Sequence, residues 1–290
     1  MEFKDIKSVY FVGAGGIGMS AIARYFIRKG VVVAGYDKTP SALTHQLERE
    51  GMLIHYEENV NEIPHACRDP KSCLVIYTPA IPAEHKELQF FRNGGFEIEK
   101  RAQVLGTLTL AHHGLCVAGT HGKTSTSTMC AHIMHQSHID CNAFLGGISK
   151  NYGTNYILSD QSDYVVIEAD EFDRSFLRLH PEGAVVTAMD ADHMDIYRDM
   201  DDLRGAFIQF GRQCSDILVV RKGLEGYFRD AGISAEVRTY GPGGDYYASD
   251  IVSDGQGKMF FTLNTPDGKI EHCHAGVPGE VYIENATAAA

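Results

Sequence analysis

The chain has 290 residues, which at roughly 100–200 residues per domain suggests two domains. Apolar residues make up 44% of the chain and charged residues 22%, as in globular proteins with a sizeable core, so a disordered chain is excluded. Asp and Glu number 38 against 26 Lys and Arg; the formal net charge of -12 disfavours a nucleic-acid partner. Seven cysteines without C-x-x-C spacing indicate free thiols and a cytoplasmic protein. Neither a signal peptide nor an apolar run of about 20 residues is present, so we expect no membrane span.

The first hundred residues alternate apolar strands with helical patterns, which is typical of a doubly wound parallel sheet. We therefore predict a Rossmann-like α/β domain over residues 1–106. Its predicted elements are the strands Ser8–Val12, Val31–Tyr36 and Leu74–Tyr77, the helix Gly16–Lys29, and the helix Arg101–Ala111 that leads out of the domain.

A second cycle of strands and helices follows and predicts a P-loop NTPase-like central α/β domain over residues 107–290. From Asp245 the pattern changes to alternating segments separated by Asp-Gly pairs at 254–255 and 267–268, which predict a small antiparallel sheet. The last residues, Glu284 to Ala290, have a helical pattern that no Gly or Pro ends, so we expect the sequence to stop inside a helix. Earlier predicted elements are the strands Leu115–Ala118, Tyr164–Ile167, Ala184–Thr187 and Ile217–Val220, and the helices Thr124–Ser137 and Met200–Arg212.

A glycine-rich stretch follows the first predicted strand and opens the first helix. It reads Gly13-Ala14-Gly15-Gly16-Ile17-Gly18, which satisfies G-x-G-x-x-G, and Asp37 ends the next strand. Glycines at this place let backbone N–H groups approach a diphosphate at a helix N-terminus, and the acid can accept from a ribose hydroxyl. The pattern predicts a nucleotide diphosphate site without distinguishing NAD from other nucleotides. A glycine turn that only packs helix on strand is the alternative.

A second glycine loop lies between a predicted strand and a predicted helix and reads Gly119-Thr120-His121-Gly122-Lys123-Thr124. It is shorter than G-x-x-x-x-G-K-[ST], because Val117 stands where the first glycine is expected. The backbone amides, the Lys123 ammonium and the Thr124 hydroxyl still supply the groups that surround phosphates and Mg²⁺. We predict an ATP site here.

Two acidic clusters follow later strands, Glu168-Ala169-Asp170-Glu171 and Asp190-Ala191-Asp192-His193. Because ligands sit at the carboxyl ends of strands in an open α/β sheet, both clusters are expected at the edge that carries the second glycine loop. Carboxylate oxygens suit Mg²⁺, which favours Glu168 as a ligand. His193 is either a ligand or a capping or core histidine. For at least one of Asp170, Glu171 and Asp173 we expect a solvated loop charge.

Four segments, in this order, resemble the Mur ligases of peptidoglycan synthesis: VYFVGAGGIGMSAIA, VAGTHGKTSTSTM, IEADEFDRSFL and DADHMDIY. The first glycine loop is most similar to that of the alanine-adding member. The resemblance implies three domains, of which the first two are represented here, and an ATP-dependent amide ligase. Such an enzyme phosphorylates the carboxylate of UDP-N-acetylmuramate, and the amine of L-alanine then attacks the acyl phosphate. Without the third domain we expect the chain to be inactive alone and its amino-acid specificity to stay open.

The resemblance also implies roles for single residues. Lys123, Glu168 and His193 would be catalytic, and Thr124, Glu168 and His193 would hold two Mg²⁺ ions. The remaining ATP contacts would come from Gly119, Thr120, His121, Gly122, Lys123, Thr124, Ser125 and Asn285. The UDP substrate would contact Gly13, Ala14, Gly15, Gly16, Ile17, Gly18, Asp37, Gly147 and Asn155. Residues that depart from the family pattern are Phe172, Ala188, Val281 and Tyr282.

Three other functions stay open. A related ligase that recycles intact peptides onto the same sugar is the nearest alternative within the family. An NAD-dependent oxidoreductase would use the first glycine loop but leave the second loop and both acidic clusters without a role. A non-catalytic nucleotide-binding protein would use both loops without turnover.

Overall fold

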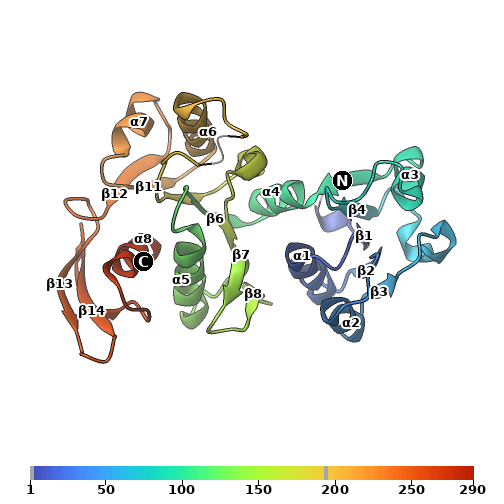
Figure 1. Cartoon of the computed structure of the whole chain (residues 1–290), viewed down its shortest axis with the longest axis horizontal. Coiled ribbons are helices and arrows are strands. Elements are labelled where there is room, and N and C mark those ends of the chain that lie inside the picture. Colours follow the sequence, from blue (N-terminus) through green and yellow to red (C-terminus); the bar gives the residue numbers. More distant parts are fainter. Residues whose placement is uncertain (1–2, 193–194) are drawn as a thin grey trace. The chain divides into compact units, whose positions relative to one another are not determined.

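The computed structural model describes residues 3–192 and 195–290. The chain divides into two compact units, Met1–Thr107 and Leu108–Ala290, each built on its own sheet (Figure 1). The boundary expected between residues 106 and 107 lies next to this division. All seven cysteines are free thiols. No helix within the described parts of the chain is long and apolar enough to cross a membrane.

Unit 1 is a five-stranded parallel sheet in the order β3-β2-β1-β4-β5. All five residues of the central strand β1 are buried, as expected for an apolar run covered on both faces. The strand order reverses at β1, which pairs with β2 on one side and β4 on the other, so a ligand crevice is expected where β1 ends. The strands are β1 (Ser8–Val12), β2 (Val32–Tyr36), β3 (Leu53–His55), β4 (Cys73–Tyr77) and β5 (Glu97–Lys100).

Three α-helices and three short 3-10 helices lie between Phe3 and Lys100, ahead of the helix Arg101–Ala111 that leads out of unit 1. The long helix begins at Ile17, within the first glycine loop, with Gly16 as its N-cap and a mostly buried face. The second helix begins with a capping box in which Ser41 and Thr44 satisfy each other's backbone N–H groups. The helices are α1 (Ile17–Arg28), α2 (Ala42–Arg49) and α3 (Lys86–Asn93), and the 3-10 helices are η1 (Phe3–Asp5), η2 (Val60–Glu62) and η3 (His65–Cys67).

Unit 2 is a seven-stranded sheet in the order β12-β11-β10-β6-β9-β7-β8, parallel except for the pair β7 and β8. The helix α4 (Arg101–Ala111) leads into it. Its strands are β6 (His113–Ala118), β7 (Asn142–Ser149), β8 (Thr154–Ile157), β9 (Tyr164–Glu168), β10 (Gly183–Val186), β11 (Ile217–Arg221) and β12 (Glu236–Tyr240). Its helices are α5 (Lys123–Gln136), α6 (Met200–Arg212), α7 (Glu225–Asp230) and the 3-10 helix η4 (Phe172–Arg178).

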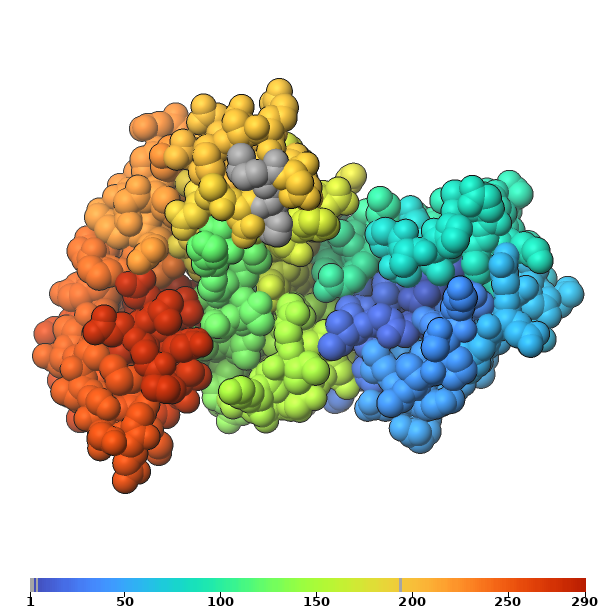
Figure 2. All heavy atoms as spheres, in the orientation of Figure 1, coloured from blue at the N-terminus to red at the C-terminus, as the bar shows by residue number. Residues whose placement is uncertain are grey.

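A three-stranded antiparallel sheet and the last helix form the appendage of unit 2. The sheet contains β13 (Tyr247–Ser253), β14 (Met259–Thr265) and β15 (Gly268–His274), and α8 (Glu280–Ala289) follows. Phe261 and Leu263 of β14 pack on Ile283 of α8 in one apolar cluster. In Figures 1 and 2, α8 lies between this sheet and α5. The predicted α/β fold with its antiparallel appendage is therefore confirmed, including both turns at the Asp-Gly pairs.

Candidate active site

The second glycine loop connects the central strand β6 to the helix α5 at the carboxyl edge of the sheet. Gly119 and Gly122 have positive φ angles of 132° and 79°, a conformation that favours glycine. A Cβ at position 119 would overlap the Thr187 hydroxyl and lie 2.8 Å from the backbone nitrogen of Ala188. The amide of Thr120 donates to the Ala188 carbonyl at 3.1 Å. The loop is thus fixed against the segment after β10.

Lys123 is the first residue of α5, and its ammonium forms an ion pair with Glu171. The Nζ atom lies 2.8 Å from both carboxylate oxygens of Glu171. The carboxylate is fully buried and the lysine side chain is 14% exposed. The expectation that at least one of three acids is a solvated loop charge is confirmed, since Asp170 and Asp173 are exposed, whereas Glu171 is buried. A cation thus stands at the N-terminus of a helix whose free N–H groups attract anions.

The end of β9 places Glu168 beside the hydroxyl of Thr124. The Thr124 hydroxyl donates to Glu168 Oε1 at 3.0 Å, and the amide of Gly146 donates to Oε2 at 2.8 Å. A Cβ at position 146 would overlap this carboxylate, so any side chain there would displace Glu168 from its place beside Thr124. Thr124 and Glu168 together present oxygen ligands on one side of the loop, which fits the preference of Mg²⁺.

The other residues predicted around this loop have different surroundings. Asn285 of α8 is buried, and its Oδ1 would lie 3.0 Å from a Cβ at Gly122, so it borders the loop. His121 is exposed, and its Nε2 lies 3.9 Å from Asp190. Asn155 is buried in the hairpin of β7 and β8, where its amide donates to the Leu145 carbonyl at 3.5 Å.

A surface cavity of about 360 Å³ lies next to the loop. Ser125 lines this cavity together with Thr124. Gly147 lies nearby, since a Cβ there would be 3.2 Å from the Thr124 methyl group. His193 lies outside the described residues. Within residues 3–192 and 195–290, no group of three or more His, Cys, Asp or Glu is arranged as a metal site.

The first glycine loop follows β1 and is held by β2 and by Asp37. The amides of Gly13 and Ala14 donate to the Tyr36 carbonyl at 2.8 and 3.1 Å. The amide of Gly15 donates to Asp37 Oδ2 at 2.6 Å, and the amide of Thr39 donates to Oδ1 at 3.1 Å. Asp37 therefore orders this loop, and the lone pairs that remain on its oxygens can accept further hydrogen bonds.

Arg101 is a neighbour of the first loop that the sequence patterns did not single out. A Cβ at Gly18 would lie 2.5 Å from Arg101 Nε and 2.8 Å from Cζ. The guanidinium group therefore fills the space that a side chain at position 18 would need. Gly16 and Ile17 are exposed at the start of α1, so this end of the loop is accessible from the solvent.

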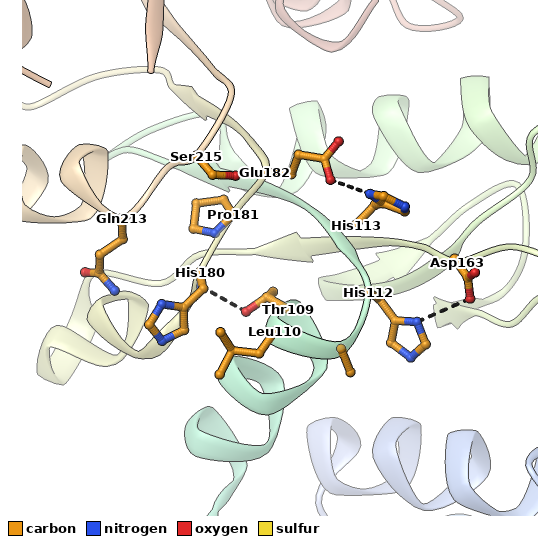
Figure 3. Close-up of a pocket in the computed structure, with 11 residues that line it drawn as sticks. Thr109, Leu110, His112, His113, Asp163, His180, Pro181, Glu182, Gln213 and Ser215 are labelled. Carbon is orange, nitrogen blue, oxygen red and sulfur yellow. Dashed lines mark hydrogen bonds and ion pairs between the residues drawn. The ribbon is translucent and has the colours of Figure 1, made fainter. Parts of the chain in front are cut away.

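A larger cavity of about 540 Å³ lies at the opposite, amino edge of the unit 2 sheet (Figure 3). His113 faces Glu182 there, and His112 Nδ1 lies 3.6 Å from Asp163 Oδ1. The hydrogen bond to Glu182 raises the pKa of His113. No predicted site residue lines this cavity.

Comparison with known proteins decides the family. The model of the Mur ligase middle domain matches residues 117–290, and the model "Mur ligase family, catalytic domain" matches residues 8–113. The chain belongs to the Mur ligase family. The family resemblance of the four sequence segments is thereby confirmed.

Relatives and solved structures extend this family assignment. The chain is 54% identical over its whole length to the UDP-N-acetylmuramate–L-alanine ligase of Phocaeicola vulgatus, and 51% identical over 98% to that of Porphyromonas gingivalis. It spans 63% of the length of both relatives. The crystal structure of UDP-N-acetylmuramate–alanine ligase from Thermotoga maritima has a TM-score of 0.76 at 26% identity, covering 97% of this chain and 63% of that one. The UDP-N-acetylmuramate:L-alanyl-gamma-D-glutamyl-meso-diaminopimelate ligase from Neisseria meningitides has a similar fold, with a TM-score of 0.80 at 23% identity, covering 98% of this chain and 92% of that one.

Proposed function

We propose that this Mur ligase chain provides the nucleotide- and sugar-binding parts of an ATP-dependent ligase that joins L-alanine to UDP-N-acetylmuramate. The observation that carries the proposal is the juxtaposition of Lys123 with Glu171, and of Thr124 with Glu168, around one glycine loop. The names of the two relatives with 54% and 51% identity support the choice of substrates. We place the reaction in the cytoplasm, since a chain with seven free thiols suits a reducing compartment.

Each group around the second loop would have one task. The loop amides and the Lys123 ammonium would bind the ATP phosphates, as they surround phosphates in P-loops. Thr124 and Glu168 would hold Mg²⁺, with His193 as ligand to a second ion. Bound Mg²⁺ supplies positive charge between two anions, the γ-phosphate and the muramoyl carboxylate. The first loop would hold the diphosphate of UDP at the start of α1, where the N–H groups of a helix N-terminus attract anions.

Placement and charge neutralisation would make up most of the catalysis. In phosphoryl transfer the protein contributes mainly position and electrostatic stabilisation, and no nucleophilic side chain is required. The carboxylate of the sugar would take the γ-phosphoryl group, and the amine of L-alanine would expel phosphate from the acyl phosphate. Gly146 and Ser127 would keep Glu168 in place, because both point donors at its Oε2.

The test uses a chimera, because the chain spans only 63% of its relatives. The remaining segment of the Phocaeicola vulgatus relative is fused after Ala290, and product is followed by mass spectrometry. We expect UDP-N-acetylmuramoyl-L-alanine from the chimera, none from the chain alone, and a loss of at least about 1,000-fold in Lys123→Ala.

Three outcomes would contradict the proposal. A folded Lys123→Ala chimera with near-normal turnover would exclude the second loop as the ATP site. Transfer of an intact peptide in place of L-alanine would identify the recycling ligase. Hydride transfer with NAD in place of ligation would identify an oxidoreductase.

A further inference from the structure

Glu171 differs from every other acid of its segment in being fully buried. Its side chain is 0% exposed, whereas Asp170 and Asp173 lie at the surface. Taking a carboxylate out of water is costly unless a partner compensates its charge. The compensating group is the Lys123 ammonium, 2.8 Å from each carboxylate oxygen. The fold therefore places a buried anion behind the one lysine of the second loop.

The backbone of Glu171 is fixed from a second direction. The hydroxyl of Tyr197 donates to the Glu171 carbonyl at 2.7 Å. Burial raises the pKa of Tyr197 to about 12, so this hydroxyl keeps its proton at neutral pH. The guanidinium of Arg174 lies 4.8 Å from the centre of the Tyr197 ring and 2.6 Å from Asp202 of α6. Glu171 is thus held by groups that do not depend on Lys123.

The ammonium group of a lysine must be restrained by a neighbouring group if it is to stay in one position. Its four-carbon stem is flexible, so holding the ammonium in one place costs rotamer entropy. An ion pair at a surface would not restrain it, since exposed pairs contribute little and are screened by salt. Lys222 and Glu225 form such a pair in this chain, with Nζ 2.7 Å from Oε1 and side chains 43% and 17% exposed. Lys123 and Glu171 form a contrasting, buried pair.

We propose that Glu171 is a positioning residue, whose buried carboxylate holds the Lys123 ammonium ready for the phosphates. The proposal rests on the ATP site proposed above and adds a residue to it. An ammonium has three N–H donors, and one donates to Glu171 Oε1 at 2.8 Å, so donors remain for a phosphate. Glu171 itself would touch neither the nucleotide nor the sugar.

The first test measures Lys123 directly and needs no nucleotide. The chain is acetylated with a succinimidyl ester, and the rate at each lysine is read by peptide mass spectrometry. We expect Lys123 to react about tenfold more slowly than Lys222, and Glu171→Gln to remove this protection. Glu182→Gln is the matched control, since Glu182 lies at the opposite edge of the sheet and its loss leaves Lys123 unchanged. Unchanged protection of Lys123 in a folded Glu171→Gln chain would overturn the proposal.

The second test measures Mg·ATP binding to the chain by calorimetry. We expect Glu171→Gln to raise the dissociation constant about tenfold, because Lys123 must then be ordered on binding. Glu171→Asp keeps the charge but is one methylene shorter. We expect its dissociation constant for Mg·ATP to lie between those of the parent chain and Glu171→Gln. Tighter ATP binding in Glu171→Gln would contradict the proposal, since the carboxylate would then compete for the ammonium.

Two further variants separate the possible causes of failure. If Lys123→Ala binds ATP as well as the parent chain, the ATP site itself is misplaced, whatever Glu171 does. If Glu171→Gln does not fold, Tyr197→Phe offers the same test, because it loosens the Glu171 backbone and leaves the ion pair in place. Lys123 should then be acetylated about two- to threefold faster, as expected for loss of one net hydrogen bond of modest strength. An unchanged rate in Tyr197→Phe would contradict the positioning role.

Discussion

Both glycine loops follow a buried central strand and open a helix, but different groups surround them. The first loop is held by the Tyr36 carbonyl and by Asp37, and Arg101 lies against Gly18. The second loop is held by the segment after β10 and carries its own cation, Lys123. A loop of backbone amides suits a diphosphate that is only bound, whereas a loop with a restrained cation suits phosphates that take part in a reaction.

Among the residues that the structure describes, each unit fully buries one carboxylate, and the two have different partners. Glu87 of unit 1 accepts from the Tyr10 hydroxyl at 2.6 Å and from the Asn59 amide at 2.9 Å, and its other neighbour is the His55 ring at 2.9 Å. Glu171 of unit 2 pairs with an ammonium. The first arrangement connects elements of the core, while the second leaves a charge pair next to a loop that would bind phosphates. The same residue type therefore serves stability in one unit and the site in the other.

The largest effect is expected for Gly119→Ala in the second loop. The new Cβ meets backbone as well as the Thr187 hydroxyl, and φ is 132°, so unit 2 should lose about 3 kcal/mol of unfolding free energy. Urea unfolding followed by circular dichroism measures it. Gly205→Ala is the control, because this exposed helix position is open and alanine there should stabilise by up to about 1 kcal/mol. Equal effects of the two variants would argue against a constrained loop.

Glu87→Gln should have the next largest effect, on unit 1. Burial alone would raise the pKa of Glu87, but hydrogen bonds from His55, Tyr10 and the Asn59 amide hold the pKa below its usual value. Its contribution is therefore present above pH 4.5 and is lost as the pH falls through the lowered pKa. We expect Glu87→Gln to lower the free energy of unfolding of unit 1 by about 2 kcal/mol at pH 7. The stability of this variant should then decrease less on acidification than that of the parent chain.

If the stability of Glu87→Gln falls on acidification as steeply as that of the parent chain, the acid sensitivity of unit 1 has another origin. Chemical unfolding at pH 7 and at steps below pH 5 provides the comparison.

Gly18→Ala tests the contact between the first loop and Arg101. It should lower the free energy of unfolding less than Gly119→Ala does. The obstacle is the Arg101 side chain, which can move, so we expect a loss of about 1 kcal/mol. The UDP ligand should bind more weakly if the displaced guanidinium contributes to the diphosphate site. Unaltered UDP-N-acetylmuramate binding in calorimetry would show that Arg101 only packs against the loop.

The smallest effect on stability is expected for His113 at the cavity of Figure 3. Its contribution to stability has the opposite pH dependence to that of Glu87. The raised pKa of His113 means that its pair with Glu182 stabilises unit 2 below pH 6.5 and is lost as the pH rises through the raised value. His113→Asn should lower the melting temperature slightly at pH 6 and leave it unchanged at pH 9. A decrease that is larger at pH 9 would contradict this sign.

Periodic, apolar segments of the fold could be predicted closely from the sequence. The strand at 8–12 and the helices at 101–111 and 200–212 have the predicted bounds. Polar or edge elements were not predicted, such as β5, whose residues Glu97–Lys100 are all at least partly exposed, and β8. Their strand conformation depends on pairing with a neighbour, which a short window of sequence does not contain.

Some residues of the candidate site could likewise be predicted from the sequence, and others could not. Lys123, Thr124 and Glu168 follow from motif and strand order, because parallel strands bring their carboxyl ends together. The role of Glu171 could not be predicted, since its burial depends on Lys123 and Tyr197, which lie 48 and 26 positions away in the sequence. Asp170 and Glu171 are adjacent acids, and only packing makes one exposed and the other buried.

One calorimetric experiment tests the division of labour between the two loops most directly. The parent chain and Lys123→Ala are each titrated with Mg·ATP and with UDP-N-acetylmuramate. We expect the variant to lose at least about 30-fold in ATP affinity, because the only lysine of the second loop is gone, while UDP-N-acetylmuramate binds within about twofold of the parent. Equal losses for both ligands, or an ATP affinity that does not change, would contradict the assignment of one nucleotide to each loop.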